Sequence, residues 1–93
     1  MMTRDEVLER AKAAVLGDRE QDYGSPETNF LRIANFWNTY LAGRLQAVLY
    51  PKDVAAMLAL LKLARIASGH AKEDNWVDLA GYAACGGELE SNE

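Results

Sequence analysis

The segment PKDVAAMLALLKLARIAS, from Pro51 to Ser68, is a long apolar run with few charges. Its apolar residues recur at helical spacing, and the neighbouring positions extend this apolar character most of the way round. Pro51 disfavours a helical backbone at the residue before it, and Gly69 ends the pattern. The sequence therefore predicts an apolar helix over residues 51–68, at the centre of the fold.

Helices are predicted on both sides of this stretch. Upstream, Ser25 suits an N-cap and Pro26 suits the first position of a helix over residues 26–42. Its inner face is expected to consist of Phe30, Ile33, Ala34, Trp37, Tyr40 and Leu41. Downstream, Asp74 or Asn75 caps a helix over residues 75–89. Its inner face is expected to consist of Trp76, Leu79, Ala80 and Ala83.

The N-terminal segment predicts one more helix, over residues 4–16. Thr3 and Glu6 fit the S/T-x-x-E capping box, and the apolar residues that follow form one stripe. Residues 17–25 lack that stripe and are predicted to be a loop, and residues 90–93 a frayed tail. No segment alternates with a period of two. The predicted fold is all-α, a single domain over residues 1–93 that resembles a four-helix bundle.

Composition narrows the function classes. The 93 residues carry a formal net charge of −4, which argues against binding of duplex nucleic acid because such binding needs clustered Lys and Arg. The single cysteine, Cys85, forms no intrachain disulfide, so a reducing, cytoplasmic location is expected. No stretch reaches the ~18 apolar residues of a membrane span. Small size and abundant apolar helix surface predict a homo-oligomer.

Four charged residues lie on the two C-terminal helices. Asp74 and Asp78 are four apart and Lys62 and Arg65 three apart, so each pair shares one helix face. If the helices pack antiparallel, the two faces meet. One interpretation is an internal Lys/Arg–Asp network that fixes the register of the helices. In the other, Asp74 and Asp78 hold Mg²⁺ while Lys62 or Arg65 meets a phosphate.

A second candidate site is the loop segment Asp22-Tyr23-Gly24. A loop acid beside an aromatic ring and a flexible glycine can close over a ligand, the acid taking a donor or metal and the ring stacking on a base. Asn29 follows on the first turn of the next helix and would join this site. The alternative is a plain turn with Tyr23 packed on the core.

A spaced pattern extends over roughly residues 18–89. It consists of Asp18-Arg19, Asp22-Tyr23-Gly24, Asn29-Phe30, Ile33-Ala34, Trp37, Asp53-Val54-Ala55, Leu61-Lys62-Leu63-Ala64-Arg65 and Asp74-Asn75-Trp76-Val77-Asp78-Leu79-Ala80-Gly81-Tyr82. This pattern resembles a family of small phage and prophage proteins of uncharacterised function. The resemblance implies that the protein acts in the cytosol of a bacterial host.

The D-Y-G…K-x-x-R…D-x-x-x-D-x-x-x-Y skeleton is also similar to the phage-associated nucleotide-modification domain and, more distantly, to MazG-like all-α nucleoside triphosphate pyrophosphohydrolases. That resemblance implies an oligomer that uses Mg²⁺, held by acidic residues on paired helices, to cleave between the α- and β-phosphates. The MazG-like pattern has an E-E-x-x-E cluster on one helix, where this chain reads LLKLAR over residues 60–65. Asp74 and Asp78 are then the residues that stand for the second acidic cluster.

Three functions follow from these residues. The first is Mg²⁺-dependent hydrolysis of a phosphoanhydride, with acids holding the metal and Lys62 and Arg65 stabilising negative charge. The second keeps the pocket without turnover, as a nucleotide sensor or sequestering protein. The third is a structural adaptor, in which the charged residues pair among themselves and an aromatic face docks a partner or a second copy.

Overall fold

The long apolar stretch forms helix α4 (Pro51–Ala67) in a computed structural model of the chain, which describes residues 2–18, 21–22, 24–69 and 72–91. The other α-helices are α1 (Arg4–Ala13), α3 (Pro26–Tyr40) and α5 (Glu73–Ser91), and a π-helical turn, η1 (Ala14–Asp18), continues α1. No β-strand occurs among these described residues. The predicted all-α class is confirmed.

The helix starts and two of the helix stops follow the sequence signals. The Glu6 N–H donates to Thr3 Oγ1 over 3.1 Å, and the Thr28 N–H donates to Ser25 Oγ over 3.3 Å. Gly43 and Gly69 have φ of 83° and 84°, a conformation that glycine adopts readily and other residues do not. The caps and stops therefore fix where α1 and α3 begin and where α3 and α4 end.

The predicted loop over residues 17–25 is wrong in part. The helical path continues to Asp18 through η1, and Gln21 and Asp22 are also helical. Gly17 directly follows the predicted helix over residues 4–16, but it is not among the glycines with positive φ, whereas Gly24 has φ of 82°. A glycine that keeps a right-handed backbone does not end a helix, and the wider π turn carries the chain past it.

Helix α5 is longer at both ends than predicted. It begins at Glu73 and includes positions 90 and 91, which were expected to fray; residues 92–93 lie outside the described residues. Leu89 is buried, Lys52 Nζ lies 3.2 Å from Glu90 Oε2, and the Ser91 hydroxyl donates to the Gly87 carbonyl. The first two contacts hold the last turn against α4 and the third closes that turn within α5, which explains why it does not fray.

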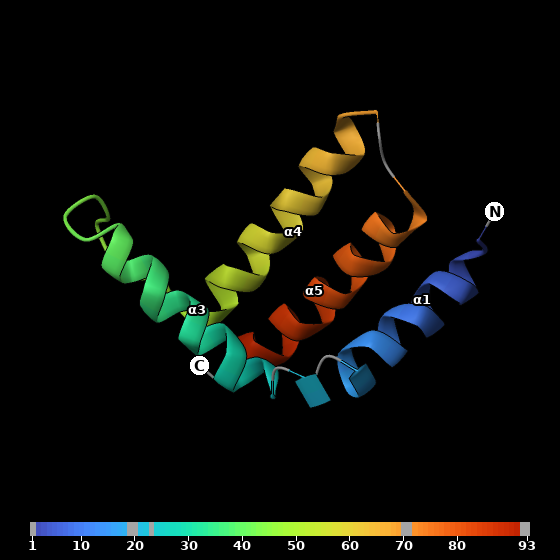
Figure 1. Cartoon of the computed structure of the whole chain (residues 1–93), viewed down its shortest axis with the longest axis horizontal. Coiled ribbons are helices and arrows are strands. Elements are labelled where there is room, and N and C mark those ends of the chain that lie inside the picture. Colours follow the sequence, from blue (N-terminus) through green and yellow to red (C-terminus); the bar gives the residue numbers. More distant parts are fainter. Residues whose placement is uncertain (1, 19–20, 23, 70–71, 92–93) are drawn as a thin grey trace.

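Helix α5, and not α4 as predicted, lies at the centre of the fold. Figure 1 shows α4 and α5 running antiparallel, α1 on the other side of α5, and α3 crossing the start of α4 and the end of α5. Helix α5 packs against α1, α3 and α4, so it takes the central place predicted for α4. Trp76, expected to face inward, and Leu60 of α4 are half-exposed or more.

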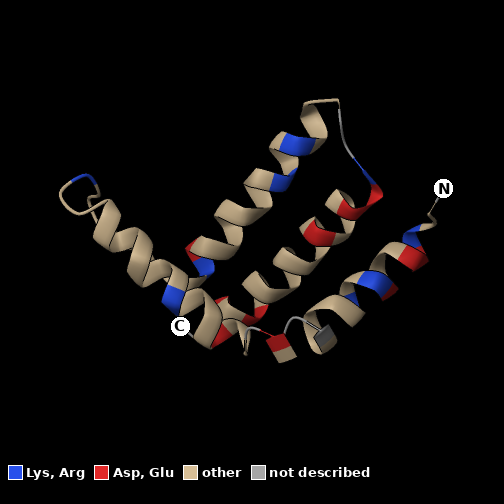
Figure 2. Cartoon of the chain, in the orientation of Figure 1, with Lys and Arg blue, Asp and Glu red and all other residues tan. Residues whose placement is uncertain are grey.

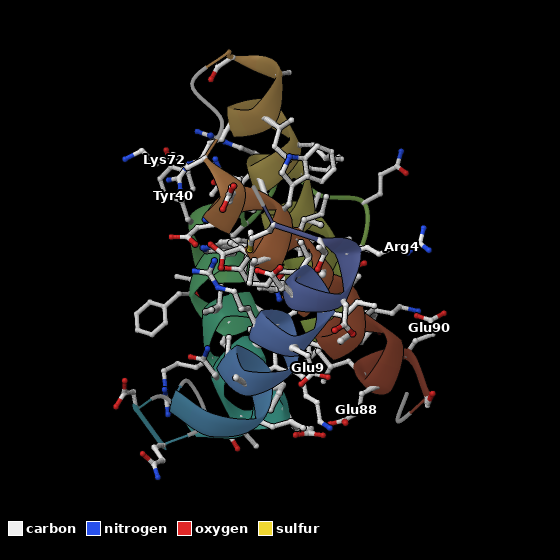
Figure 3. All side chains as sticks on the ribbon, turned by 90° about the vertical axis from the view of Figure 1, so that its right-hand side faces the viewer. Arg4, Glu9, Tyr40, Lys72, Glu88 and Glu90 are labelled. Carbon is white, nitrogen blue, oxygen red and sulfur yellow. The ribbon has the colours of Figure 1, made fainter. Side chains whose placement is uncertain are left out.

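The core lies where α3 meets the first turns of α4 and the last turns of α5. It consists of Phe30, Ala34, Val54, Ala55 and Leu89. Tyr40, expected on this inner face, is 78% exposed because α3 diverges from α4 toward its C-terminal end. Side chains such as Arg4 and Glu90 extend outward from α1 and α5 (Figure 3). No described helix is both long and apolar enough to cross a membrane.

The connection from α3 to α4 is held back against α3 by one side chain. The Asn38 amide donates to the Leu49 carbonyl over 3.0 Å and accepts from the Leu49 N–H over 2.7 Å. Both groups of Leu49 are partly buried. These two hydrogen bonds satisfy the backbone N–H and carbonyl of Leu49. They hold the linker in place two residues before α4 begins.

Replacing Asn38 with Ala is expected to lower the free energy of unfolding by about 1–3 kcal/mol, because two partly buried backbone groups lose their partners. Asn35→Ala is the matched control, since Asn35 is exposed on the same helix. Urea denaturation followed by circular dichroism measures both. Equal losses in the two variants would contradict the role given to Asn38.

Candidate functional site

A largely buried ion pair joins α4 to α5. Lys62 Nζ lies 2.9 Å from Asp78 Oδ2, with the two side chains 10% and 23% exposed. Lys62 shares the face of α4 that carries Ala55 and Leu58, so its position on the helix turns it toward α5. Removing charges from water is costly, and each of these charges offsets that cost for the other.

Asp74 does not join this pair. Arg10 of α1 donates to Asp74 Oδ1 over 3.0 Å, and the two side chains are 52% and 71% exposed. A pair this exposed contributes little, about 0–1 kcal/mol. The two aspartates that share a helix face in the sequence therefore contact cations from two different helices, one buried and one at the surface.

The remaining predicted site residues lie apart from the buried pair or outside the described residues. Arg65 is exposed, one turn beyond Lys62 on α4, and Asp22 is exposed in the short helical segment after η1. Tyr23 lies outside the described residues. Asn29 is partly buried on α3. Of the predicted site residues, the structure thus brings Lys62 and Asp78 together. Asn29 lies near Asp78, and both line a small cavity.

This small cavity lies between η1, the start of α3 and the middle of α5. Its polar lining residues are Asn29 and Asp78, and its aromatic ones are Phe30 and Tyr82, whose ring centroids lie 6.4 Å apart. The remaining lining residues are Ala14, Val15, Gly24, Pro26, Val77, Gly81 and Cys85. The cavity volume is about 40 Å³, which accommodates a few water molecules but not a nucleoside.

Two glycines of α5 allow its neighbours to approach closely. A Cβ on Gly81 would lie 3.1 Å from Val15 Cγ1 of η1, and a Cβ on Gly86 would lie 3.3 Å from the Ala55 Cβ of α4. Gly86 therefore allows close approach of the two C-terminal helices. Gly81 instead admits η1, which closes one side of the cavity.

Glu27 lies in the first turn of α3, next to the cavity-lining Pro26. Hydrogen bonding to its own backbone N–H lowers the pKa of Glu27, and hydrogen bonds with Glu88 and Ser25 act in the same direction, while burial opposes them. Its carboxylate is therefore charged at neutral pH.

The side chains that could hold a metal are few. Within the described part of the chain, no group of three or more His, Cys, Asp or Glu side chains is placed to bind a metal ion. Asp78 borders the cavity and Asp74 points to Arg10. Asp74 and Asp78 thus contact different cations, and the Mg²⁺ site predicted from them stays a prediction.

These features define a small all-α protein with one buried Lys–Asp pair beside a narrow cavity. The chain belongs to the family described as Domain of unknown function (DUF6378), whose model matches residues 6–90. It is 42% identical over 77 residues to the Gene 55 protein of Mycobacterium phage L5, and 35% identical over 81 residues to the Gene 55 protein of Mycobacterium phage D29. The predicted relationship to a phage protein family is confirmed.

The chain spans about half the length of these phage relatives. The matches cover 83% and 87% of this chain but 47% and 51% of the two Gene 55 proteins. No solved structure matches the chain.

Sequence reasoning found both members of the buried pair but missed the partner of Asp74. Arg10 lies 64 positions away, on what the sequence marks as a solvated helix face. The contact between Val15 of η1 and Gly81 was also missed, because it joins positions 66 residues apart in the sequence. A glycine inside an otherwise regular helix was the available signal that another segment approaches there.

Asp78→Asn is expected to lower the free energy of unfolding by about 3 kcal/mol or more, because it leaves Lys62 charged and unpaired in a largely buried position. Asp74→Asn is the matched control and should cost less than about 1 kcal/mol. Urea titration at neutral pH gives both values. Similar losses of stability in the two variants would show that the buried Lys62–Asp78 pair contributes no more than the exposed Arg10–Asp74 pair.

Proposed function

We propose that this chain binds a phosphorylated small molecule, most simply a nucleotide, at the cavity bordered by Asp78, Asn29 and Tyr82. The observation that carries this proposal is the largely buried Lys62–Asp78 pair, of which Asp78 lines the cavity. An apolar and aromatic cavity with a few converging polar groups is the common form of a ligand site. The similarity to nucleotide-processing helical proteins, noted from the sequence pattern, supports the same class of ligand.

The charge arrangement favours a ligand that carries both signs. A phosphate alone would take Lys62 and leave Asp78 buried without a partner, which is costly. A Mg²⁺–phosphate ligand avoids this cost, since Asp78 would hold the metal while Lys62 would hold a phosphate oxygen. Each buried charge would exchange one partner for another. Binding is therefore proposed to depend on Mg²⁺.

The size of the cavity implies that binding opens it. About 40 Å³ does not hold a nucleoside, so the walls formed by η1 and the start of α3 must separate from α5. Asn29 on α3 would then follow the ligand as a hydrogen-bonding group. Arg65 and Asp22 do not line this cavity, and Tyr23 lies outside the described residues, so their part in binding stays a prediction from the sequence.

The donor set favours binding without turnover over catalysis. The MazG-like chemistry draws on acidic clusters from two helices, whereas here the two acids on α5 stand without a cluster on α4. A sensor or sequestering protein needs only the pocket. The proposed function is accordingly nucleotide binding, with hydrolysis decided by a product assay.

A structural adaptor is the second candidate function. The observation that favours it is that Lys62 and Asp78 already satisfy each other and Asp74 already contacts Arg10. In that case the pair serves only to hold α4 on α5. Ligand screening separates the two functions.

Thermal unfolding with nucleoside mono-, di- and triphosphates, each with and without Mg²⁺, tests the proposal. A ligand at a hundred times its Kd adds about 2.7 kcal/mol to stability, which corresponds to a rise in Tm of roughly 10 °C or more for a chain of this size. We expect such a rise with at least one compound and only when Mg²⁺ is present.

Asn29→Ala should weaken this binding about tenfold by loss of a polar contact, whereas Asn35→Ala, on the exposed side of the same helix, should not. Isothermal titration with the compound found in the screen measures both. Chromatography of the incubated nucleotide separates sequestering from hydrolysis. Absence of any shift across the panel would leave the adaptor as the function.

A further inference from the structure

Helix α4 is apolar on two opposite sides, and only one of them is covered. The covered side carries Ala55, Leu58 and Lys62 and faces α5. The opposite side carries Met57, Leu60, Leu61 and Ala64, here named the outer stripe, and all four are exposed. Their spacing of three, one and three residues places them on a single helix face. A helix that is apolar all round is normally buried on every side.

The amount of exposed surface is large for the mass of the chain. The chain exposes 6582 Å² at 10.3 kDa, whereas a monomeric protein of this mass is expected to expose about 5,350 Å². The excess of roughly 1,200 Å² exceeds the ~800 Å² that each partner buries in a standard interface. The radius of gyration is 14.1 Å, against about 12 Å expected for a compact domain of this length.

The arrangement of the helices leaves the outer stripe accessible. Helix α3 crosses only the first turns of α4, and Figure 1 shows the two helices diverging toward their C-terminal ends. Leu60 and Leu61 are 62% and 45% exposed, and Met57 is 38% exposed. Among the described residues, no helix of the same chain covers this side of α4 beyond its start.

We propose that a second copy of this chain covers the outer stripe, with the two α4 helices antiparallel about a two-fold axis between Leu60 and Leu61. The stripe is symmetric about that point, so a two-fold axis places Leu60 of one copy on Leu61 of the other and Met57 on Ala64. A two-fold interface requires this kind of self-complementary patch. The inference does not depend on the proposed ligand, because Lys62 points to the opposite side of α4.

Charge favours the antiparallel orientation and a second copy as the occupant. Figure 2 shows α4 uncharged between its first turn and the Lys62 and Arg65 region. In the antiparallel pair, the second copy's Arg65 faces position 56 of the first copy. Asp53 lies about one helical turn from position 56, at a distance of about 4.5 Å along the helix axis. Opposite charges then meet at both ends of the stripe, and the helix dipoles oppose each other. A parallel pair would place like charges together.

The experiment is sedimentation velocity of the 93-residue chain over about 1–100 µM, since dimer content depends on protomer concentration. The wild-type chain should sediment with twice the mass of one copy. Leu60→Glu and Leu61→Lys should each raise the dissociation constant roughly 100-fold or more, because each buries two unpaired charges per dimer. Leu8→Glu is the control, since Leu8 of α1 is 64% exposed and lies away from the stripe.

Mixing the two variants tests the orientation. A copy with Leu60→Glu paired with a copy with Leu61→Lys brings the two new charges face to face and leaves wild-type leucines at the other crossing. The mixture should therefore regain dimers that neither variant forms alone, while circular dichroism shows unchanged helix content in each. A monomeric wild-type chain, a dimer that survives Leu60→Glu, equal dissociation by Leu8→Glu, or a mixture that stays monomeric would each overturn the proposal.

Discussion

The orientation of α4 on α5 depends above all on the largely buried ion pair of Lys62 with Asp78. Two charges that are largely withdrawn from water tolerate no other rotation of α4, because turning the helix by one residue would leave both without a partner. The close contact of Ala55 with Gly86 fixes the same helices toward the other end of their contact. Together these contacts decide which side of α4 faces inward and therefore which leucines face outward.

The same pair limits what the cavity can accept. Because Lys62 and Asp78 neutralise each other, the wall offers no net charge, and a simple anion gains little by approaching it. Selectivity for the ligand would come from the need to give Lys62 and Asp78 each a new partner at the same time. This argument favours a metal-bound phosphate over a free one on electrostatic grounds, and it explains why a cavity of only about 40 Å³ leaves no unpaired charge.

Local features of the fold were readable in the sequence, and long-range ones were not. The Thr3–Glu6 box, the Ser25 cap and the stop at Gly69 each act within a few residues, so pattern and chemistry predict them. Lys62 and Asp78 could be matched because a short connection makes α4 and α5 neighbours. The Arg10–Asp74 contact joins helices with two others between them in sequence, and no local pattern encodes it.

The prediction that α4 is the central, buried helix failed for a physical reason. An apolar pattern shows that a surface prefers to leave water, but it does not say whether the same chain or another copy covers it. Burial of Val54 and Ala55 satisfies this preference on one side, and the exposure of Leu60 and Leu61 leaves it unsatisfied on the other. Since the buried charge pair prevents α4 from rotating to cover its leucines, only another molecule can do so. The interaction that anchors the helix inside one chain thereby maintains the surface that a second chain would bind.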